Sequence, residues 1–522
     1  MKNIVQVKPI QEDVRQPEKE ENIRSIFYSY CENVTTLHGY GHIVRNKNNF
    51  LRILWSVVVF GLLVVLACFT FEAFDDFVQR KVLTQTQQKL VTTGGVGLPL
   101  PNVMICNRSF FSRAKLNDMG INAEMSSYLM VLVAGPGIAA KSLFTSAEGE
   151  QTLQGLQHSL DEILQERNMT LRELIDAISY TCEDLVSRCG MLSSMTEGAE
   201  CCRRFTSTPT YLGKCLLRPS YVGEKQAYGN QEGHLIYLKV PTDDTPDFSP
   251  KILTLSKTAK TGIQVTVAGN LTYQGILVFS QGAIIPPGTQ TTMMLSLTKV
   301  NNHNLRTWAD VFEEPCVPPE SITDFESLLK ISSNCFDGAV YSCFKEMCGC
   351  TTLQDVNATE RLCTPQATAE CLDALFFQIG KMAHTDAFVG IRSSPSPEVL
   401  RQLQRCWERE KARCVTACEE FYFSYVSNTV PIRPEVAEAL GEEFGMDNMT
   451  QVAVVTASFP KMEYTEIWST RKGLDKLFAE QGCISAFFTG ASLFTMMEAS
   501  FFTIVMYCKL FSCIFRCKRK EV

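Results

Sequence analysis

Two long apolar runs near the ends of this chain limit its possible folds more than any other feature. The first spans residues 51–71, which are 21 residues with Arg52 as the single charge. The second spans residues 482–507, which are 26 residues with Glu498 as the single charge. At a rise of about 1.5 Å per residue the first reaches about 31 Å, close to a hydrocarbon core of about 30 Å, whereas the second reaches about 39 Å and must tilt, protrude or break. We expect two membrane spans, because buried core helices rarely run beyond about 20 residues without a polar face.

Charged residues around the runs predict their orientation. Basic residues precede the first run, acidic residues follow it, and a basic cluster follows the second: Arg45, Lys47 and Arg52; Glu72, Asp75 and Asp76; Lys509, Arg516, Lys518, Arg519 and Lys520. Because basic residues are retained on the cytoplasmic side, both termini of this multi-pass plasma-membrane protein are expected in the cytoplasm. The predicted divisions are a cytoplasmic N-terminus (1–49), a transmembrane helix (50–72), an extracellular domain (73–476), a second transmembrane helix (477–508) and a cytoplasmic C-terminus (509–522).

Cysteines and glycosylation sequons support that topology independently. Sixteen of the 22 cysteines lie between the two runs, an even and dense set that is typical of a disulfide framework in an oxidising compartment. Sequons lie there too, which predicts a glycoprotein with acceptors at Asn107, Asn168, Asn270, Asn357 and Asn448.

The segment between the runs mixes helical and strand patterns. Apolar spacing is helical over 153–185, 372–382 and 397–413, short alternating runs separated by turn residues fill 233–300, and 451–468 is expected to form a last strand pair. The predicted fold class is therefore an α+β membrane protein. Two transmembrane helices flank a large disulfide-rich extracellular domain with a central β-sheet and peripheral helices.

The second apolar run contains residues that a lipid-facing helix does not need. Gly490, Ala491 and Ser492 stand in a row, and Glu498 follows six residues after the serine. One interpretation is a stripe of small residues, at positions 482, 486 and 490, that packs against another helix. The other is a pore, in which a broken helix turns carbonyls and a hydroxyl toward a cation and copies of Glu498 form an acidic ring. Two spans cannot enclose a pore, so the second interpretation requires several copies of the chain.

Several short motifs accompany this run in order along the chain. They are “TTLHGYGHI” (35–43), “LPNVMICN” (100–107), “YLGKC” ending at Cys215, and the cysteine-containing segments “CFKEMCGC”, “CTPQATAEC” and “CVTAC”. Together with Gly-Ala-Ser and its following glutamate, they resemble the degenerin/epithelial sodium channel family, which includes the acid-sensing channels. The resemblance extends from about residue 30 to about residue 510.

The resemblance implies a trimeric, sodium-selective channel with a finger, thumb and palm type of extracellular domain, blocked by amiloride. It implies a selectivity filter at Gly490, Ala491 and Ser492, a pore cation site at Glu498, and gating roles for His38, Gly39 and Ala479. It also implies disulfides between Cys106 and Cys215, Cys316 and Cys418, Cys335 and Cys414, Cys343 and Cys406, Cys348 and Cys371, and Cys350 and Cys363. Two further bonds join Cys182 and Cys189 to Cys201 and Cys202, and either pairing fits.

The stimulus is predicted from departures from the acid-sensing pattern. In the thumb, Asp373 keeps one acidic position but Phe377 occupies the second, and no histidine follows the first span until His158. The long insert between the cysteines at 371 and 406 and the apolar segment 126–140 are expected to form a pocket for a short amidated peptide. We therefore expect an invertebrate channel opened by an extracellular neuropeptide similar to FMRFamide. The alternatives are a proton-gated or constitutively active sodium channel of the same family, and a two-span channel of the ATP-gated type.

Other functional classes find no support in the sequence. No GxSxG, HExxH or phosphate-loop motif occurs, so we expect no enzyme and no cofactor beyond permeant sodium. His38 and His42 lack a nearby third ligand, so no metal site is expected. The expected partners are the bilayer, the peptide and further subunits in a homotrimer or heteromer, without nucleic acid. Cysteines at 508, 513 and 517 are either palmitoylation sites or reduced cytoplasmic thiols.

Overall fold

The structure is a computed structural model of the whole chain. It describes Tyr30 and residues 37–79, 81–91, 97–134, 138–140, 142–143, 146–191, 194–220, 224–227, 232–254, 262–273, 275, 281–303, 316–355, 361–364, 367, 397–444 and 452–518. These residues form two compact units. The first unit contains the described residues up to Leu83 and from Arg471 onward, and the second contains those between Thr84 and Thr470.

The first apolar run forms a single long helix in the first unit. Helix α3 (Asn49–Val78) begins after Asn48, whose side chain accepts a hydrogen bond from the backbone N–H of Phe50. Apolar side chains lie all around it, and only Val59 and Ala73 are buried by the rest of the chain. Among the described residues it is the one helix that is long and apolar enough to cross a bilayer. A helix that is apolar on every face and uncovered by its own chain is expected to contact lipid or partner helices.

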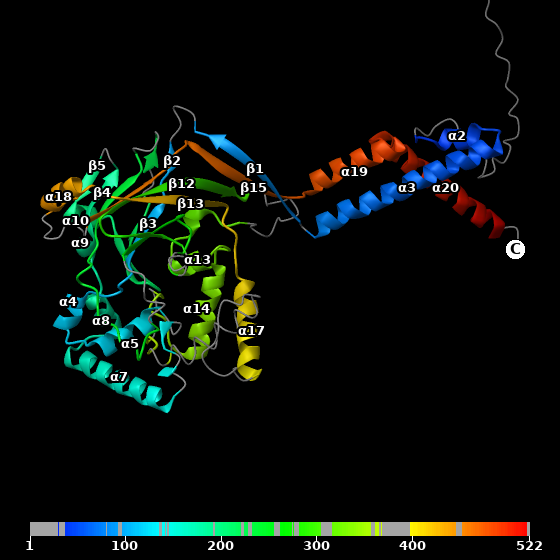
Figure 1. Cartoon of the computed structure of the whole chain (residues 1–522). Helices are drawn as coiled ribbons and strands as arrows, with labels where there is room; N and C mark the ends of the chain where they lie inside the picture. The colour runs from blue at the N-terminus through cyan, green and yellow to red at the C-terminus, as the bar shows by residue number, and fades with distance from the viewer. Residues whose placement is uncertain are drawn as a thin grey trace, which may run out of the picture. The chain divides into compact units, whose positions relative to one another are not determined.

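The second apolar run is divided into two helices. Helix α19 (Leu474–Thr489) ends at Gly490, and helix α20 (Leu493–Lys518) begins three residues later. Figure 1 shows α19 running alongside α3, and the short helix α2 (Tyr40–Arg45) also packs on α3. Sequence length predicted that this run tilts, protrudes or breaks, and in the structure its helix breaks. The apolar part of α20 covers Met497–Cys508.

An eight-stranded sheet organises the second unit. The strand order is β1 (Val82–Leu90), β15 (Glu463–Arg471), β12 (Thr289–Asn301), β14 (Val452–Ser458), β9 (His234–Lys239), β4 (Val186–Met191) and β5 (Ser194–Glu197), and β13 (Glu419–Pro431) also pairs with β12. The alternation of buried and exposed residues along β12 matches a strand with one face on the core. The predicted strands between 233 and 300 are confirmed.

The two strands predicted at 451–468 are confirmed as β14 and β15, but they do not pair with each other. Both run parallel to β12 and follow one another along the same edge of it. β14 pairs with residues 290–294 and β15 with residues 298–301, while β13 lies antiparallel to β12 over 289–301. The reason is length, because the 13 residues of β12 offer enough backbone to pair with both strands in turn.

A five-stranded sheet lies between the large sheet and a layer of helices. Its order is β11 (Ala283–Ile285), β10 (Ile263–Ala268), β3 (Asn102–Asn107), β7 (Gly213–Arg218) and β6 (Thr206–Thr210). Every residue of β3 and β10 is buried, because both faces of this sheet are covered. Val103 and Ile105 point into the core shared with the large sheet, whereas Met104 and Cys106 point into the core beneath the helices. A small two-stranded sheet of β2 (Leu98–Pro99) and β8 (Lys225–Gln226) accompanies them.

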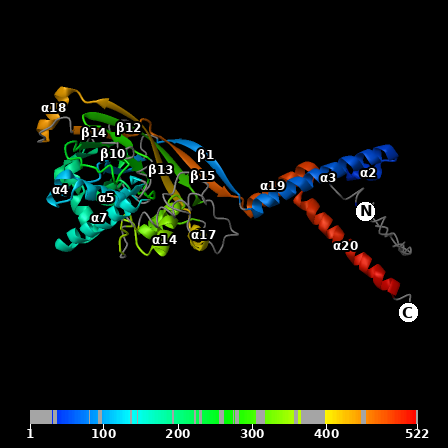
Figure 2. The same cartoon turned by 60° about the horizontal axis from the view of Figure 1, so that its bottom comes forward.

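The helical layer contains α4 (Arg113–Asp118), α5 (Ala123–Ala134), α7 (Ala147–Glu166) and α8 (Leu171–Ile178), which gather at one end of the second unit (Figures 1 and 2). The helical pattern predicted over 153–185 is thus confirmed as α7, α8 and the short α9 (Cys182–Leu185). The peptide pocket expected at 126–140 is not supported, because residues 125–133 of α5 are fully buried in the core. A helix enclosed on all sides offers no open wall to a ligand.

Disulfides fasten the remaining helices. α14 (Cys335–Cys348) and α17 (Pro397–Lys411) lie side by side, with α13 (Phe325–Leu329) and the short η4 (Pro319–Ser321) before them (Figure 1). α17 confirms the helix predicted at 397–413, whereas residues 372–382 lie outside the described part. Bonds form at 106–215, 316–418, 335–414, 343–406 and 350–363, as the resemblance implied. Cys371, the implied partner of Cys348, lies outside the described residues.

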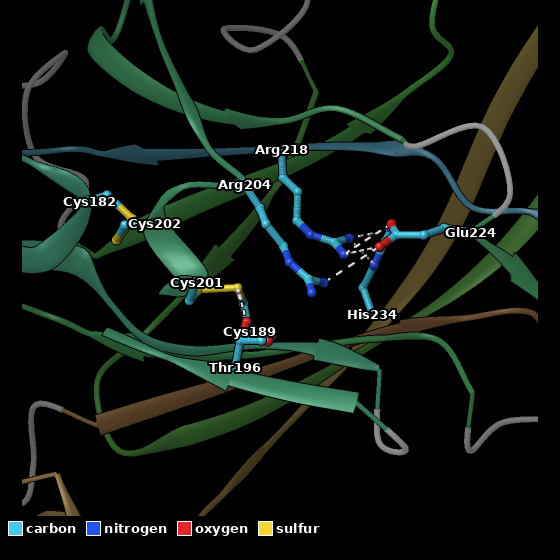
Figure 3. Close-up of a disulfide and its surroundings, with 9 residues drawn as sticks. All are labelled: Cys182, Cys189, Thr196, Cys201, Cys202, Arg204, Arg218, Glu224 and His234. Carbon is cyan, nitrogen blue, oxygen red and sulfur yellow. Dashed lines mark hydrogen bonds and ion pairs between the residues drawn. A yellow bond between two sulfur atoms is a disulfide. The ribbon is translucent and has the colours of Figure 1, made fainter. Parts of the chain in front are cut away.

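The cysteines at 182, 189, 201 and 202 form two further disulfide bonds. Cys182 bonds Cys202, and Cys189 bonds Cys201, around helix α10 (Gly198–Cys202). Figure 3 shows both bonds, which tie the ends of α9 and β4 to α10. Helix α18 (Pro434–Glu443) completes the unit. Such bonds typically stabilise a fold by about 2–4 kcal/mol each, mainly by restricting the unfolded chain.

Candidate functional site

The break between α19 and α20 is built by a glycine. Gly490 follows the last residue of α19 with φ of 68°, the left-handed region, and its N–H donates to the carbonyl of Ala486 over 2.9 Å. A glycine in this conformation at a helix end satisfies a carbonyl that the helix would otherwise leave unpaired. An L side chain resists this region, so glycine is the residue that ends the helix here without strain.

Two hydroxyls start the next helix. Ser492 Oγ accepts a hydrogen bond from the N–H of Thr495 over 3.2 Å, and the Ser492 N–H donates to Thr495 Oγ1 over 3.2 Å. The two side-chain oxygens are 3.1 Å apart. This reciprocal arrangement caps the first turn of α20. Sequence analysis missed Thr495, which is buried, although the S-x-x-T spacing before a helix was the available signal.

The His-Gly pair near the N-terminus reaches this break. The N–H of His38 donates to the carbonyl of Thr489, the last residue of α19, over 2.8 Å. A Cβ on Gly490 would lie 1.5 Å from Nδ1 of the His38 ring, so the ring occupies the space that a side chain at 490 needs. The structure thus joins His38 and Gly490, which are more than 400 residues apart in the sequence. A carbonyl exposed by the break is satisfied by the N-terminal segment.

Gly39 allows the N-terminal segment to lie against α3. Its φ is 89°, and an added Cβ would meet Cγ2 of Val59 at 2.5 Å. The ring of His42 stacks on Trp55 with centroids 4.6 Å apart. His42 is therefore held by an aromatic contact.

Contacts between α3 and α19 hold the break in place within the first unit. Thr70 Oγ1 donates to Gln481 Oε1 over 3.0 Å, and the rings of Phe69 and Phe488 lie 5.7 Å apart. Lys472 Nζ donates to the carbonyl of Ala73 over 3.4 Å and pairs with Glu480. Sequence analysis named none of these residues, because nothing in their local pattern marks them as an interface.

The other predicted pore residues lie apart from the break. Glu498 is exposed on α20, six residues and roughly 9 Å of helix beyond Ser492. Ala479 is exposed on α19, eleven residues and roughly 16 Å of helix before Gly490. Neither contacts the glycine, and their predicted roles depend on other copies of the chain.

A metal centre is not formed by the histidines and cysteines of the described residues. The one group close enough to hold an ion is His303, Cys316 and Cys418, whose donor atoms lie within 4.8 Å of one another. The two sulfurs are bonded to each other, so they are not available as thiolate ligands.

A buried arginine in the second unit contacts a histidine and a glutamate (Figure 3). Arg218 is 1% exposed and donates through Nη2 to both oxygens of Glu224, over 2.9 and 3.0 Å. Its other terminal nitrogen contacts the ring of His234, which is buried as well. Burial, with the charge of Arg218, lowers the pKa of His234 to about 3. This histidine is neutral at physiological pH and does not respond to mild acid.

A cluster of three tyrosine hydroxyls lies near the carboxyl group of Asp337. The hydroxyls of Tyr273 and Tyr341 are 3.3 Å apart, and the hydroxyl of Tyr341 donates to that of Tyr211 over 3.4 Å. Asp337 lies one turn before Tyr341 on α14, and its charge acts on Tyr211 and Tyr273. Burial raises the pKa of Asp337 to about 7. Sequence analysis missed this group because its burial depends on three distant segments.

The structure corrects one glycosylation prediction. Asn107 is 5% exposed, its Nδ2 is buried, and its Oδ1 accepts a hydrogen bond from the N–H of Ser109 over 3.0 Å. The core beneath β3 leaves no space for a sugar, so the prediction at Asn107 is wrong. Asn168 and Asn270 are exposed and stay predictions. Asn357 and Asn448 lie outside the described residues, as do Asp373 and Phe377.

Comparison with protein-family models places most of the chain in one family. The protein-family model described as “Amiloride-sensitive sodium channel” matches residues 30–502, which include both the His-Gly pair and the break after α19. No curated protein matches the chain.

Proposed function

This chain belongs to the amiloride-sensitive sodium channel family, and from that premise we propose that it is a sodium-selective channel opened by a short extracellular peptide and blocked by amiloride. Family membership supports sodium-channel function, an oligomeric assembly and a plasma-membrane location. The peptide as stimulus, the trimer and the pore residues belong to the proposal.

The proposed topology has two membrane spans and cytoplasmic termini. α3 supplies the first span, and the divided run at 482–507 supplies the second. Basic residues precede α3 and end α20, which favours a cytoplasmic location for both ends. The disulfides of the second unit favour an extracellular location for the segment between the spans.

The observation that carries the pore assignment is the break at Gly490, Ala491 and Ser492. Non-helical backbone at membrane depth is tolerated where it is buried in protein or lines a water-filled cavity. In the proposed trimer these residues from each copy surround the axis, where carbonyls and hydroxyls replace part of the water shell of sodium. His38 supports the break from the cytoplasmic side through its bond to Thr489. The copies of Glu498 attract cations farther along the path.

The same residues have a second candidate role. Positions 482, 486 and 490 form a small-residue stripe, and Ser492 is already engaged as a helix cap. A stripe of this kind favours close packing of α19 against a helix from another subunit. The two roles are compatible at Gly490 but differ in what they predict for position 482.

The proposed stimulus rests on the sequence alone. The thumb lacks the second acidic position of acid-sensing relatives, and the insert between the cysteines at 371 and 406 is long. The alternatives are proton gating and constitutive activity. Membership of this family favours all three over the ATP-gated architecture.

The test is expression of the full chain in oocytes, with currents recorded during application of amidated peptides and during stepwise acidification. We expect a peptide-evoked, sodium-selective current that amiloride blocks. A bulky substitution at Ala479 supplies a ligand-free control, since it is expected to hold the channel open. Current evoked by acid and by no peptide would refute the proposed stimulus. Absence of current with the open-state variant at the cell surface would refute conduction.

A further inference from the structure

A cavity of about 430 Å³ opens between strands of the second unit. Its walls include Val91, which follows β1, and Gly97, which precedes β2, together with residues of β2, β8, β12, β13 and β15. This volume lies in the range of pockets that hold small organic molecules, about 300 to 1,000 Å³. None of the proposed pore residues lines this cavity.

The interior of the cavity is apolar and aromatic. Leu98, Leu100 and Leu297 line it and belong to the core between the two large sheets, each at most 3% exposed. Phe421 and Tyr464 contribute partly buried rings. Such a surface favours a ligand with a flat, apolar body, because aromatic rings gain energy from stacking and from leaving water.

The wall is held in shape by internal hydrogen bonds. Asn102, which is buried, accepts a bond from the N–H of Ser220 over 2.6 Å and donates to the carbonyl of Gly269 over 3.4 Å. These bonds join the start of β3 to the segments after β7 and β10. A ligand therefore enters a preformed site and does not have to order these segments.

Among the described residues that line the cavity, Lys225 is the one cation that pairs with no carboxylate. Glu224 is neutralised by Arg218 at 2.9 Å and by Arg204 at 3.7 Å, and Lys299 pairs with Glu419 at 2.9 Å. Lys225 lines the same cavity and forms no ion pair with any residue that the structure describes. The uncompensated charge is positive, so the site favours an anion.

We propose that this cavity binds an amphipathic anion, an aromatic carboxylate whose ring lies among Leu297, Phe421 and Tyr464 and whose carboxylate pairs with Lys225. β15, which forms part of the wall, is followed after a short connection by α19. A bound ligand would therefore brace a strand that leads directly into the divided helix. Binding at this site does not depend on peptide gating.

The test measures equilibrium binding of three small probes to the purified full-length protein in lipid nanodiscs, with empty nanodiscs as the blank. The probes are naphthoate, the neutral naphthamide and the cationic naphthylmethylammonium, and saturation-transfer NMR gives their dissociation constants. We expect naphthoate to bind at least about fivefold more tightly than the amide, the effect of one partly exposed ion pair, and the cation to bind most weakly.

A charge reversal assigns the anion preference to its residue. Lys225→Glu should remove the preference for naphthoate, whereas Lys251→Glu should leave it unchanged, since Lys251 is exposed and does not line the cavity. No binding of any probe, equal binding of all three by the wild type, or an unchanged preference in Lys225→Glu would each overturn the proposal. The comparison of the three probes on the wild type holds even if a variant fails to fold.

Discussion

Substitution of Gly490 by alanine offers the sharpest test of the divided helix. The left-handed φ of 68° costs an L residue about 1–2 kcal/mol. The new Cβ would also lie 1.5 Å from His38 Nδ1, so the ring must leave and the nearby bond from His38 to Thr489 is expected to weaken, which costs about 0.5–1.5 kcal/mol. The total of about 1.5–3.5 kcal/mol corresponds to a factor of roughly 10 to 400 in the population of the native break.

The assay compares Gly490→Ala with Gly482→Ala in oocytes, by surface biotinylation, current amplitude and reversal potential. Gly482 is helical, and an added Cβ there meets nothing of this chain within 4 Å. Gly482→Ala should therefore express and conduct normally, with a gain in helix propensity of up to about 1 kcal/mol. Gly490→Ala should reach the surface but lose most of its sodium current.

A second substitution separates the collision from the backbone strain. His38→Ala removes the ring but keeps the backbone N–H that bonds Thr489, so the double variant should be less impaired than the sum of the single variants. If Gly490→Ala has the current, selectivity and surface expression of the wild type, the break after α19 is not needed for conduction. A loss of assembly in Gly482→Ala would instead show that the small-residue stripe packs against another copy.

Further outcomes follow for individual side chains. Ser492→Ala should destabilise the start of α20 by about 1 kcal/mol, because the helix loses its capping hydroxyl. The same variant should show a lower preference for sodium over potassium, measured from bi-ionic reversal potentials. Unchanged permeability ratios would show that Ser492 is not part of the selectivity filter. Glu498→Ala should lower single-channel conductance while leaving the amount of channel at the surface unchanged, and equal conductance would place the carboxylate away from the ion path. For Asp337 the folded pKa of about 7 exceeds the ordinary value of 3.8 for an aspartate, so the folded state binds the proton more tightly than the unfolded state. Stability should therefore rise as pH falls from about 7 toward 4 and stay flat above 7. Asp337→Asn should abolish that part of the pH dependence of stability, which is at most about 4 kcal/mol. Thermal unfolding of the purified protein at several pH values measures it, and parallel pH profiles for wild type and variant would contradict the raised pKa of Asp337.

Local sequence was sufficient for the features that depend on neighbouring residues. The length and composition of residues 51–71 predicted α3, and the run of small residues at 490–492 predicted the place where the second run divides. Both follow from short-range physics: the fit of a helix to an apolar medium, and the conformational freedom of glycine. The resemblance added five disulfide pairs that the structure contains, because family spacing carries information on contacts that a single chain does not.

Tertiary structure decided what depends on segments far apart in the chain. Cys201 and Cys202 are equivalent in sequence, and only the path of α10 past β4 gives Cys189 to the first and Cys182 to the second. Asn107 carries a valid sequon, yet the sheets on either side of β3 bury its amide.

The same holds for contacts between distant elements. The bond from His38 to Thr489 joins two segments that are more than 400 residues apart, and the raised pKa of Asp337 comes from burial of its carboxyl group in the folded chain. Helix ends and apolar length are set by interactions within a few residues, which sequence alone determines. Burial and charge environment are sums over neighbours that only the folded chain brings together.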